Sequence, residues 1–268
     1  MDRETGEHVA VKLCQSKALE KNAWTRICPE EPMEEVRSLR ALQDAAGGAH
    51  PNVVRLLDTF EHSGFFWIVL EFCEGGELFE DIMERAKTGA INHAHNLALV
   101  EQMARGLAIV HAVDIAHLDV SLENYLIAAD GTVKLCDFGL AQEVHLPLTA
   151  PRGKALYMAP EVALPKLQET VEDYDPRSAD VFSLGICLFM MSAGFRPFEK
   201  PSVKDSRFVF LLKHGPRALL EKFNIHVPEA VLEILDMTLT LPKGRSNLRE
   251  VLGALLQRVR HSQRGDRT

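Results

Sequence analysis

The pattern of apolar residues changes at the pair Gly75-Gly76, and this change limits what the chain can fold into. Before the pair, runs rich in β-branched and aromatic residues predict strands at 7–14, 50–60 and 64–73, with one helix over 32–46. After it, apolar residues recur at helical spacing over 78–89, 92–113 and beyond 162, interrupted by two short strands within 125–136. The pattern predicts an α+β chain whose small strand-rich part precedes a larger helical part.

The composition excludes several classes of protein. The chain carries 30 Lys and Arg against 38 Asp and Glu, and its net charge of −8 argues against a nucleic-acid binder. No apolar run approaches the ~20 residues that a membrane-spanning helix needs, and the N-terminus lacks the pattern of a signal peptide. The five cysteines are scattered without metal-ligand spacing, so we interpret them as reduced thiols, expect no zinc, and predict a cytoplasmic protein.

Six short motifs carry residues that suit phosphoryl transfer. That reaction needs cations against the phosphates, oxygen ligands for magnesium, and a carboxylate that orients the attacking hydroxyl. The motifs are, in chain order, VAVK ending at Lys12, HLDVSLEN at 117–124, DFG at 137–139, APE at 159–161, DVFSLG from Asp180, and PKGRSN with Arg245. Each motif alone is a weak signal, and their common order carries the argument.

In this order and at these separations, the motifs resemble those of the eukaryotic protein kinases, over residues 1 to about 260. The resemblance is closer to the serine/threonine kinases than to the tyrosine kinases, whose form of catalytic loop is absent, and it extends to divergent kinases of protists. It implies a bilobal fold with a partial small lobe at 1–72 and a helical lobe at 73–268. It also implies ATP and Mg2+ as cofactors and a protein as the substrate.

The resemblance assigns the phosphate-binding lysine and its partner. Lys12 is implied to grip the α and β phosphates, and Glu35 to pair with it from the following helix. Glu34 is the competing partner. We prefer Glu35 because the apolar residues of that helix then face the core.

The resemblance also assigns the centre of catalysis. Asp119 is implied to be the catalytic carboxylate, while Asn124 and Asp137 are implied to be the magnesium ligands. Supporting contacts are implied from Asp180 to the catalytic loop, and between Glu161 and Arg245.

A nucleotide-binding surface follows from the same resemblance. Its implied members are Leu70 as gatekeeper, Glu71 and Cys73 as hinge residues, Glu77 at the ribose, and Ala10 and Leu126 on either side of the adenine. For the apolar members, packing in the core is an equally sufficient explanation.

Two departures concern the phosphate lid and activation. No glycine-rich loop precedes Lys12, which suggests either a piece of a longer product or a kinase without a lid, and we favour the former. The arginine expected after His117 is Leu118, so a phosphate on Thr149 would lack its usual cationic receiver. We therefore predict activity that does not depend on phosphorylation of Thr149.

A third departure exchanges two residue types. The catalytic-loop lysine of serine/threonine kinases is Ser121 here, and the threonine of their GT-x-x-Y-x-APE segment is Lys154. One hypothesis is a transposition in which Lys154 reaches toward the transferred phosphate and Ser121 hydrogen-bonds Asp119. The alternative is that Lys154 points to solvent or to an acidic substrate.

The leading interpretation is an ATP-dependent protein serine/threonine kinase. The alternative is a pseudokinase or truncated kinase domain that acts as a regulatory binding module for a partner protein. The missing lid, Leu118 and Ser121 favour this alternative, whereas the retained charged residues oppose it, because a scaffold has no physical need for all of them. A small-molecule kinase of similar fold is a third possibility.

The acidic stretch 171–176 either favours basic substrates or is a solvated loop.

Overall fold

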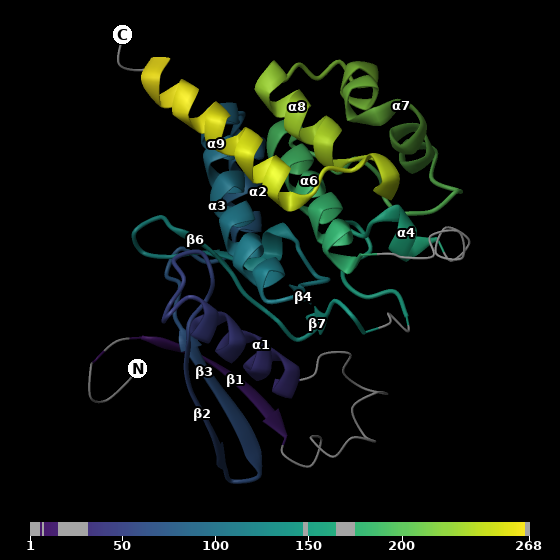
Figure 1. Ribbon diagram of the computed structural model, residues 1–268. Helices are drawn as coiled ribbons and strands as arrows, with labels where there is room; N and C mark the ends of the chain where they lie inside the picture. The colour runs from purple at the N-terminus through teal and green to yellow at the C-terminus, as the bar shows by residue number, and fades with distance from the viewer. Residues whose placement is uncertain (1–5, 7, 16–31, 147–149, 165–174, 266–268) are drawn as a thin grey trace.

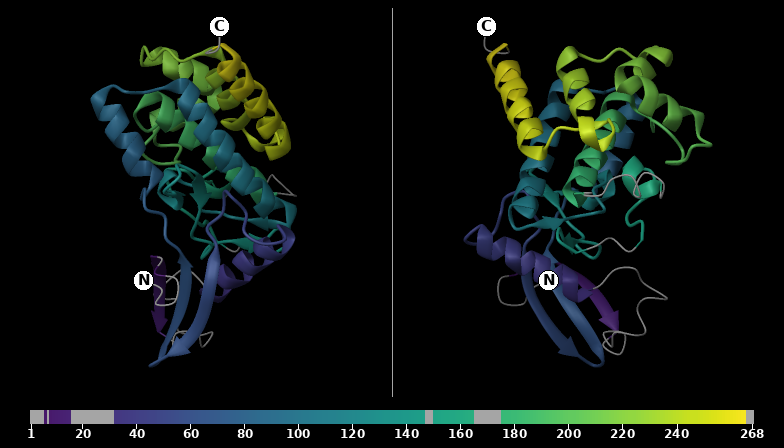
Figure 2. Two further views of the ribbon diagram at one scale, coloured as in Figure 1. Left: turned by 90° about the vertical axis from the view of Figure 1, so that its left-hand side faces the viewer. Right: turned by 45° about the vertical axis from the view of Figure 1, so that its right-hand side comes forward.

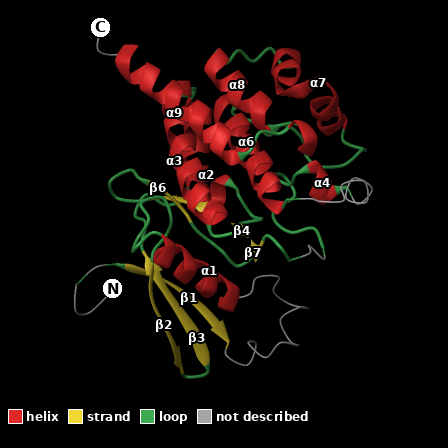
Figure 3. Ribbon diagram, in the orientation of Figure 1, coloured by secondary structure: helices red, strands yellow, loops and turns green. Residues whose placement is uncertain are grey.

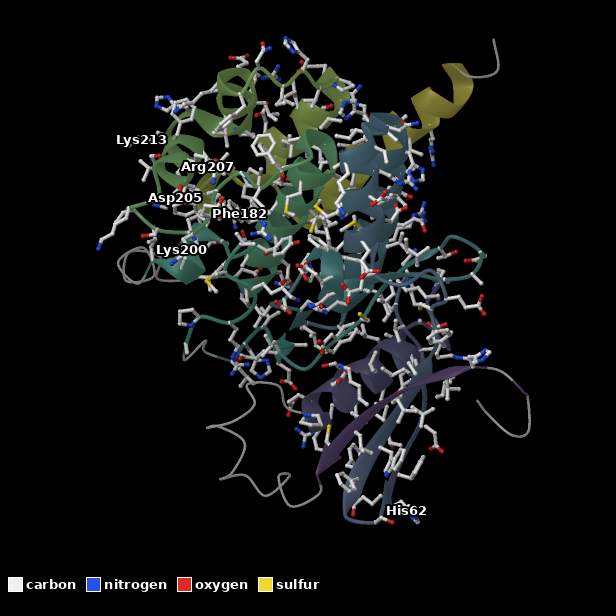
Figure 4. All side chains as sticks on the ribbon, turned by 180° about the vertical axis from the view of Figure 1, so that it is seen from behind. His62, Phe182, Lys200, Asp205, Arg207 and Lys213 are labelled. Atoms are coloured by element: carbon white, nitrogen blue, oxygen red, sulfur yellow. The ribbon has the colours of Figure 1, made fainter. Side chains whose placement is uncertain are left out.

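The computed structural model describes residues 6, 8–15, 32–146, 150–164 and 175–265. A small sheet with one helix lies at one end of the molecule, and a larger group of helices forms the other end (Figure 1). Residues 72–77 connect the two parts. In Figure 4, His62 marks the tip of a hairpin in the sheet, whereas Phe182 lies among the helices.

The small part is an antiparallel sheet covered by one helix. Its strands β1 (Val9–Gln15), β2 (Leu56–His62) and β3 (Phe65–Glu71) run in the order β1-β3-β2. Residues of β3 alternate between buried and partly exposed, as expected for a sheet with one face on a core. The helix α1 (Pro32–Ala45) buries one apolar face, so it packs against the sheet (Figure 2).

The segment before β2 corrects one prediction. The apolar pattern predicts a strand over 50–60, but the sheet strand begins only at Leu56. The preceding residues pair with the helical part instead, because the N–H of Val54 donates to Leu135 O at 2.9 Å and the N–H of Leu135 donates to Asn52 O at 3.0 Å. The side chain of Asn52 adds a hydrogen bond to Val133 O, so this segment ties the two parts together.

The larger part is built around α6, almost all of which is buried. Helix α3 packs against α6 and α9, and α6 also packs against α8 (Figure 3). Aspartate or asparagine side chains cap the start of α3, α6 and α7 by accepting backbone N–H groups. The helices are α2 (Leu78–Thr88), α3 (His93–Ala112), α4 (Pro160–Ala163), α6 (Pro176–Ala193), α7 (Ser206–Lys222), α8 (Glu229–Thr238) and α9 (Leu248–Gly265), with short 3-10 turns at Leu122–Asn124 and Pro242–Gly244.

Four short strands lie where the two parts meet. Strand β4 (Ile115–Ala116) pairs with β7 (Gln142–Glu143), and β5 (Tyr125–Ile127) pairs with β6 (Val133–Leu135). The loops between them, 117–124 and 136–141, carry most of the polar motif residues. Among the helices that the structure describes, none is both long and apolar enough to cross a bilayer.

Candidate active site

Lys12 lies between two carboxylates that come from different elements. Its Nζ is 2.8 Å from Glu35 Oε1 on α1 and 2.8 Å from Asp137 Oδ1 in the loop after β6. Glu35 is buried at 3% exposure, whereas Glu34 is partly exposed and pairs with the neighbouring Arg37. The geometry therefore selects Glu35 over Glu34 as the partner of Lys12.

The charges of this cluster reinforce one another. Burial alone would lower the pKa of Lys12, but the carboxylates of Glu35 and Asp137 outweigh it and raise that pKa. Burial would raise the pKa of Asp137, and the Lys12 ammonium overcomes this effect and lowers it. Lys12 is therefore cationic and Asp137 anionic at neutral pH, as phosphate binding and metal binding require.

The carboxylate of Asp180 in α6 holds the loop 117–124 in place. The backbone N–H groups of His117 and Leu118 donate to its two carboxylate oxygens, each at 2.8 Å. His111 contributes a further contact to Asp180 at 2.9 Å. The buried carboxylate thus fixes the backbone just before Asp119, which is the contact that the sequence analysis implies for Asp180.

Asp119 lies in a polar cluster with Asn124 and Lys154. The Nδ2 of Asn124 donates to the carbonyl of Asp119 at 2.8 Å and to its Oδ2 at 2.6 Å. The Nζ of Lys154 lies 2.9 Å from Asp119 Oδ2, 3.0 Å from Ser121 Oγ and 3.0 Å from Asn124 Oδ1. The side chain of Lys154 therefore points into the site rather than to solvent.

Ser121 is placed differently from the hypothesis. Its hydroxyl oxygen lies beside the Lys154 ammonium, and no direct hydrogen bond joins it to Asp119 in the described part of the chain. Both oxygens of Asp119 accept from Lys154 instead, Oδ1 from its backbone N–H and Oδ2 from its ammonium. Lys154 contacts both Ser121 and Asp119, and Asn124 links them as well, because its N–H donates to Ser121 O and its Nδ2 donates to Asp119.

Gly153 shapes the site and was not predicted from the sequence. Its φ of +89° is a conformation that side-chain-bearing residues rarely adopt, and a Cβ there would lie 2.3 Å from Leu118 O. Only glycine lets the segment approach the catalytic loop so closely. The available signal was its position directly before Lys154.

The implied nucleotide-binding residues fall into two groups. Ala10 of β1 lies opposite Leu70 of β3, and Glu71 is the last residue of β3. Glu77 forms an isolated antiparallel β-bridge with Leu126. Cys73 lies in the connection between β3 and α2 and is buried, and this burial raises the pKa of its thiol to about 11. Their contact with a nucleotide stays a prediction.

The residues that motivated the activation prediction are only partly described. Leu118 is 9% exposed, with φ +63°, and its backbone binds Asp180. Thr149 lies outside the described residues, as does most of the acidic stretch 171–176. The independence of activity from Thr149 phosphorylation stays a prediction.

Comparison with known proteins decides the family. A model of the protein kinase domain matches residues 1–264. The chain belongs to the protein kinase family. This confirms the expected family, and the sheet and helical parts are consistent with the fold of this kinase family.

Similar curated proteins are protein kinases, and several of them are named as serine/threonine kinases. The serine/threonine-protein kinase SRK2E of Arabidopsis thaliana is 33% identical over 207 residues, which cover 75% of this chain and 50% of that protein. The CBL-interacting protein kinase 31 of Oryza sativa subsp. japonica is 32% identical, covering 75% of this chain and 41% of its own length. The SNF-related serine/threonine-protein kinase of Rattus norvegicus is 27% identical over 250 residues, which cover 92% of this chain and 30% of that protein. The chain spans half or less of the length of these relatives.

The kinase's oxygen ligands fit the magnesium that its family uses. Asn124 and Asp137 offer amide and carboxylate oxygens, which suit a hard divalent cation. An amide oxygen has two lone pairs, so the contact of Asn124 Oδ1 with Lys154 leaves it able to bind an ion. No group of three or more His, Cys, Asp or Glu suited to a metal occurs among the described residues.

Proposed function

We propose that this kinase transfers the γ-phosphate of ATP to serine or threonine hydroxyls of protein substrates. The observation that carries the proposal is the cluster around Asp119, in which a carboxylate, an amide and an ammonium meet within hydrogen-bond distance. The Lys12–Glu35–Asp137 cluster supplies the second set of charges that the reaction needs. The serine/threonine kinases that the chain resembles support the choice of hydroxyl.

In the proposed mechanism, Lys12 neutralises the α and β phosphates while Glu35 keeps its ammonium in place. Asp119 accepts a hydrogen bond from the substrate hydroxyl and orients its oxygen toward the γ-phosphorus. A bond forms between the hydroxyl oxygen and the γ-phosphorus as the bond from the γ-phosphorus to the β–γ bridging oxygen breaks. The hydroxyl proton passes to Asp119, and ADP leaves. Asp137 and Asn124 would hold Mg2+, which would supply positive charge against the phosphates.

The proposal extends to the surroundings of the site. Glu77 would bind the ribose, the hinge backbone of Glu71 and Cys73 would bind the adenine, and Ala10, Leu70 and Leu126 would line its faces. A cytoplasmic location agrees with the four described cysteines, which form no disulfide with one another. The acidic net charge supports a protein partner rather than a nucleic acid.

The test is phosphate transfer from Mg-ATP to a serine peptide, with an Asp119→Asn variant beside the natural chain. We expect transfer to fall about 10²–10⁴-fold in the variant, which is the usual contribution of a positioned acid–base group. Asp44→Asn, at an exposed position of α1, is the matched control and should keep full activity. Nucleotide binding without transfer by the natural chain would contradict the proposal and support a regulatory binding module.

A further inference from the structure

The activation segment contributes an ammonium to the catalytic loop. Lys154 lies seventeen positions after Asp137 of DFG and precedes APE, yet its Nζ lies within 3.0 Å of oxygens from Asp119, Ser121 and Asn124. Its side chain is 37% exposed, so the residue lies at the surface of the site and is not enclosed in the core. This exposure separates it from a buried structural lysine.

We propose that Lys154 is a catalytic residue that binds the γ-phosphate during transfer. The inference rests on the proposed function and names the group that stabilises the transferred phosphate in that site. In the transfer itself, the substrate oxygen bonds to the γ-phosphorus, the bond to the bridging oxygen breaks, ADP leaves and Asp119 takes the proton. Lys154 neutralises negative charge on the equatorial phosphate oxygens while these bonds change.

The position of Ser121 supports this assignment. Its side chain is buried, and its Oγ lies 3.0 Å from the Lys154 Nζ, so positions 121 and 154 face the same point. An ammonium could reach that point from either position. With serine at 121, the charge at this end of the site comes from 154.

The backbone holds Lys154 in place for this role. Its N–H donates to Asp119 Oδ1 at 2.8 Å, and its carbonyl accepts from the N–H of Tyr157 at 3.0 Å. Tyr157 is in turn tied to α6, because Ser183 Oγ donates to its carbonyl at 2.8 Å. Gly153 provides the close approach to the catalytic loop. The ammonium is thus preorganised, which reduces the ordering cost of binding phosphate.

A coupling between nucleotide and activation segment follows. Because the cation belongs to residues 150–158, a ligand with a γ-phosphate makes a contact with this segment that ADP cannot make. Such a differential contact stabilises the segment in its present position. Backbone amides of this segment should therefore exchange more slowly with the β,γ-imido analogue of ATP than with ADP.

The test compares Lys154→Met, Lys154→Arg and the matched control Lys213→Met, whose lysine is exposed on α7 (Figure 4). We expect kcat to fall about 10²–10³-fold in Lys154→Met, as for loss of one group that stabilises transition-state charge. Lys154→Arg should recover part of the loss, and Lys213→Met should match the natural chain. Affinity for ADP should change less than about twofold in Lys154→Met, whereas the preference for the β,γ-imido analogue over ADP should fall.

Unchanged kcat in Lys154→Met would overturn the proposal. An equal loss of affinity for both nucleotides would also overturn it, because that result indicates a lysine that only supports the loop. If the natural chain binds nucleotide but transfers no phosphate, the proposed function fails, and the analogue-to-ADP preference still decides the role of Lys154. A natural chain that binds neither nucleotide would overturn both.

Discussion

Lys12 and Lys154 place ammonium groups at two ends of the same site, and they reach it in different ways. Lys12 extends from a strand that pairs along its whole length with β3, and its carboxylate partners come from α1 and the DFG loop. Lys154 extends from a loop that depends on one glycine and a few hydrogen bonds to the catalytic loop. Phosphoryl transfer therefore constrains where charge lies in space more than which element carries it.

The two ends also differ in how a change should act. At the Lys12 end, two carboxylates face one cation, so removing the cation leaves negative charge uncompensated. At the Lys154 end, one carboxylate faces one cation and neutral oxygens surround them. Substitutions can therefore separate electrostatic loss from loss of support.

The largest effect is expected for Lys12→Met. The change removes the phosphate-binding cation that lies between Glu35 and Asp137, so the rate of phosphate transfer should fall about 10²–10³-fold or more. Steady-state kinetics with varied Mg-ATP would measure this, with Lys213→Met as control. A loss smaller than that of Lys154→Met would reverse the ranking of the two ends.

The next effect concerns the anchor of the activation segment. Arg245 and Glu161 are 0% exposed, and the guanidinium also contacts Ser178 O at 2.8 Å and the ring of Phe182 (Figure 4). Arg245→Met should lower the free energy of unfolding by about 3–5 kcal/mol, because it leaves a buried carboxylate unpaired.

The matched control for this anchor is Arg207→Met. Arg207 pairs with the exposed Glu199, so its loss should cost less than about 1 kcal/mol. Urea denaturation would measure both variants. Equal destabilisation by the two substitutions would contradict a special role for the buried pair.

A smaller effect is expected for Glu35→Gln. The substitution keeps the shape but weakens the charged contact with Lys12, which contributes about 1.5–3 kcal/mol in such pairs and corresponds to roughly 10–100-fold in transfer. Glu34→Gln, one residue away and paired with Arg37, should change transfer less than about twofold. A larger loss in Glu34→Gln would show that the wrong glutamate was selected.

The smallest effect is a pH dependence of stability at His117. Burial lowers the pKa of this imidazole, and the nearby carboxylates of Asp180 and Asp119 only partly oppose it. The neutral ring fits its contacts, because Nε2–H donates to Cys136 O at 3.1 Å and Nδ1 accepts from the N–H of Asp119 at 3.3 Å. Protonation of Nδ1 would place a second N–H of the ring against the backbone N–H of Asp119, so that two donors would face each other.

The direction of the pH effect follows from proton binding. As pH falls below about 6.5, the unfolded chain binds a proton at His117 that the folded chain resists, so the free energy of unfolding decreases. Urea denaturation between pH 7 and pH 5 would measure the slope, and His117→Gln should reduce it. Burial lowers the pKa of His50, His93 and His95 as well, so part of the slope should remain. An unchanged slope in His117→Gln would contradict the assignment.

Much of the site could be predicted because its residues lie in short motifs with distinct chemistry. The choice of Glu35 over Glu34 followed from helical spacing, since only one of the two can face the core. The segment 50–55 could not be predicted, because its hydrogen bonds join residues that are about 80 positions apart. Gly153 and the contact of Ser121 with Lys154 were missed or misassigned for the same reason, as they depend on how two distant loops approach each other.

The most direct test of the central claim is to exchange the two residues. Single-turnover phosphate transfer would be measured for Lys154→Thr alone and for Ser121→Lys combined with Lys154→Thr. Because the two positions face the same point, the combined variant should recover at least about tenfold of the rate that the single variant loses. A folded, nucleotide-binding combined variant that is no faster than Lys154→Thr alone would contradict the claim that the location of the charge, rather than its carrier, governs transfer.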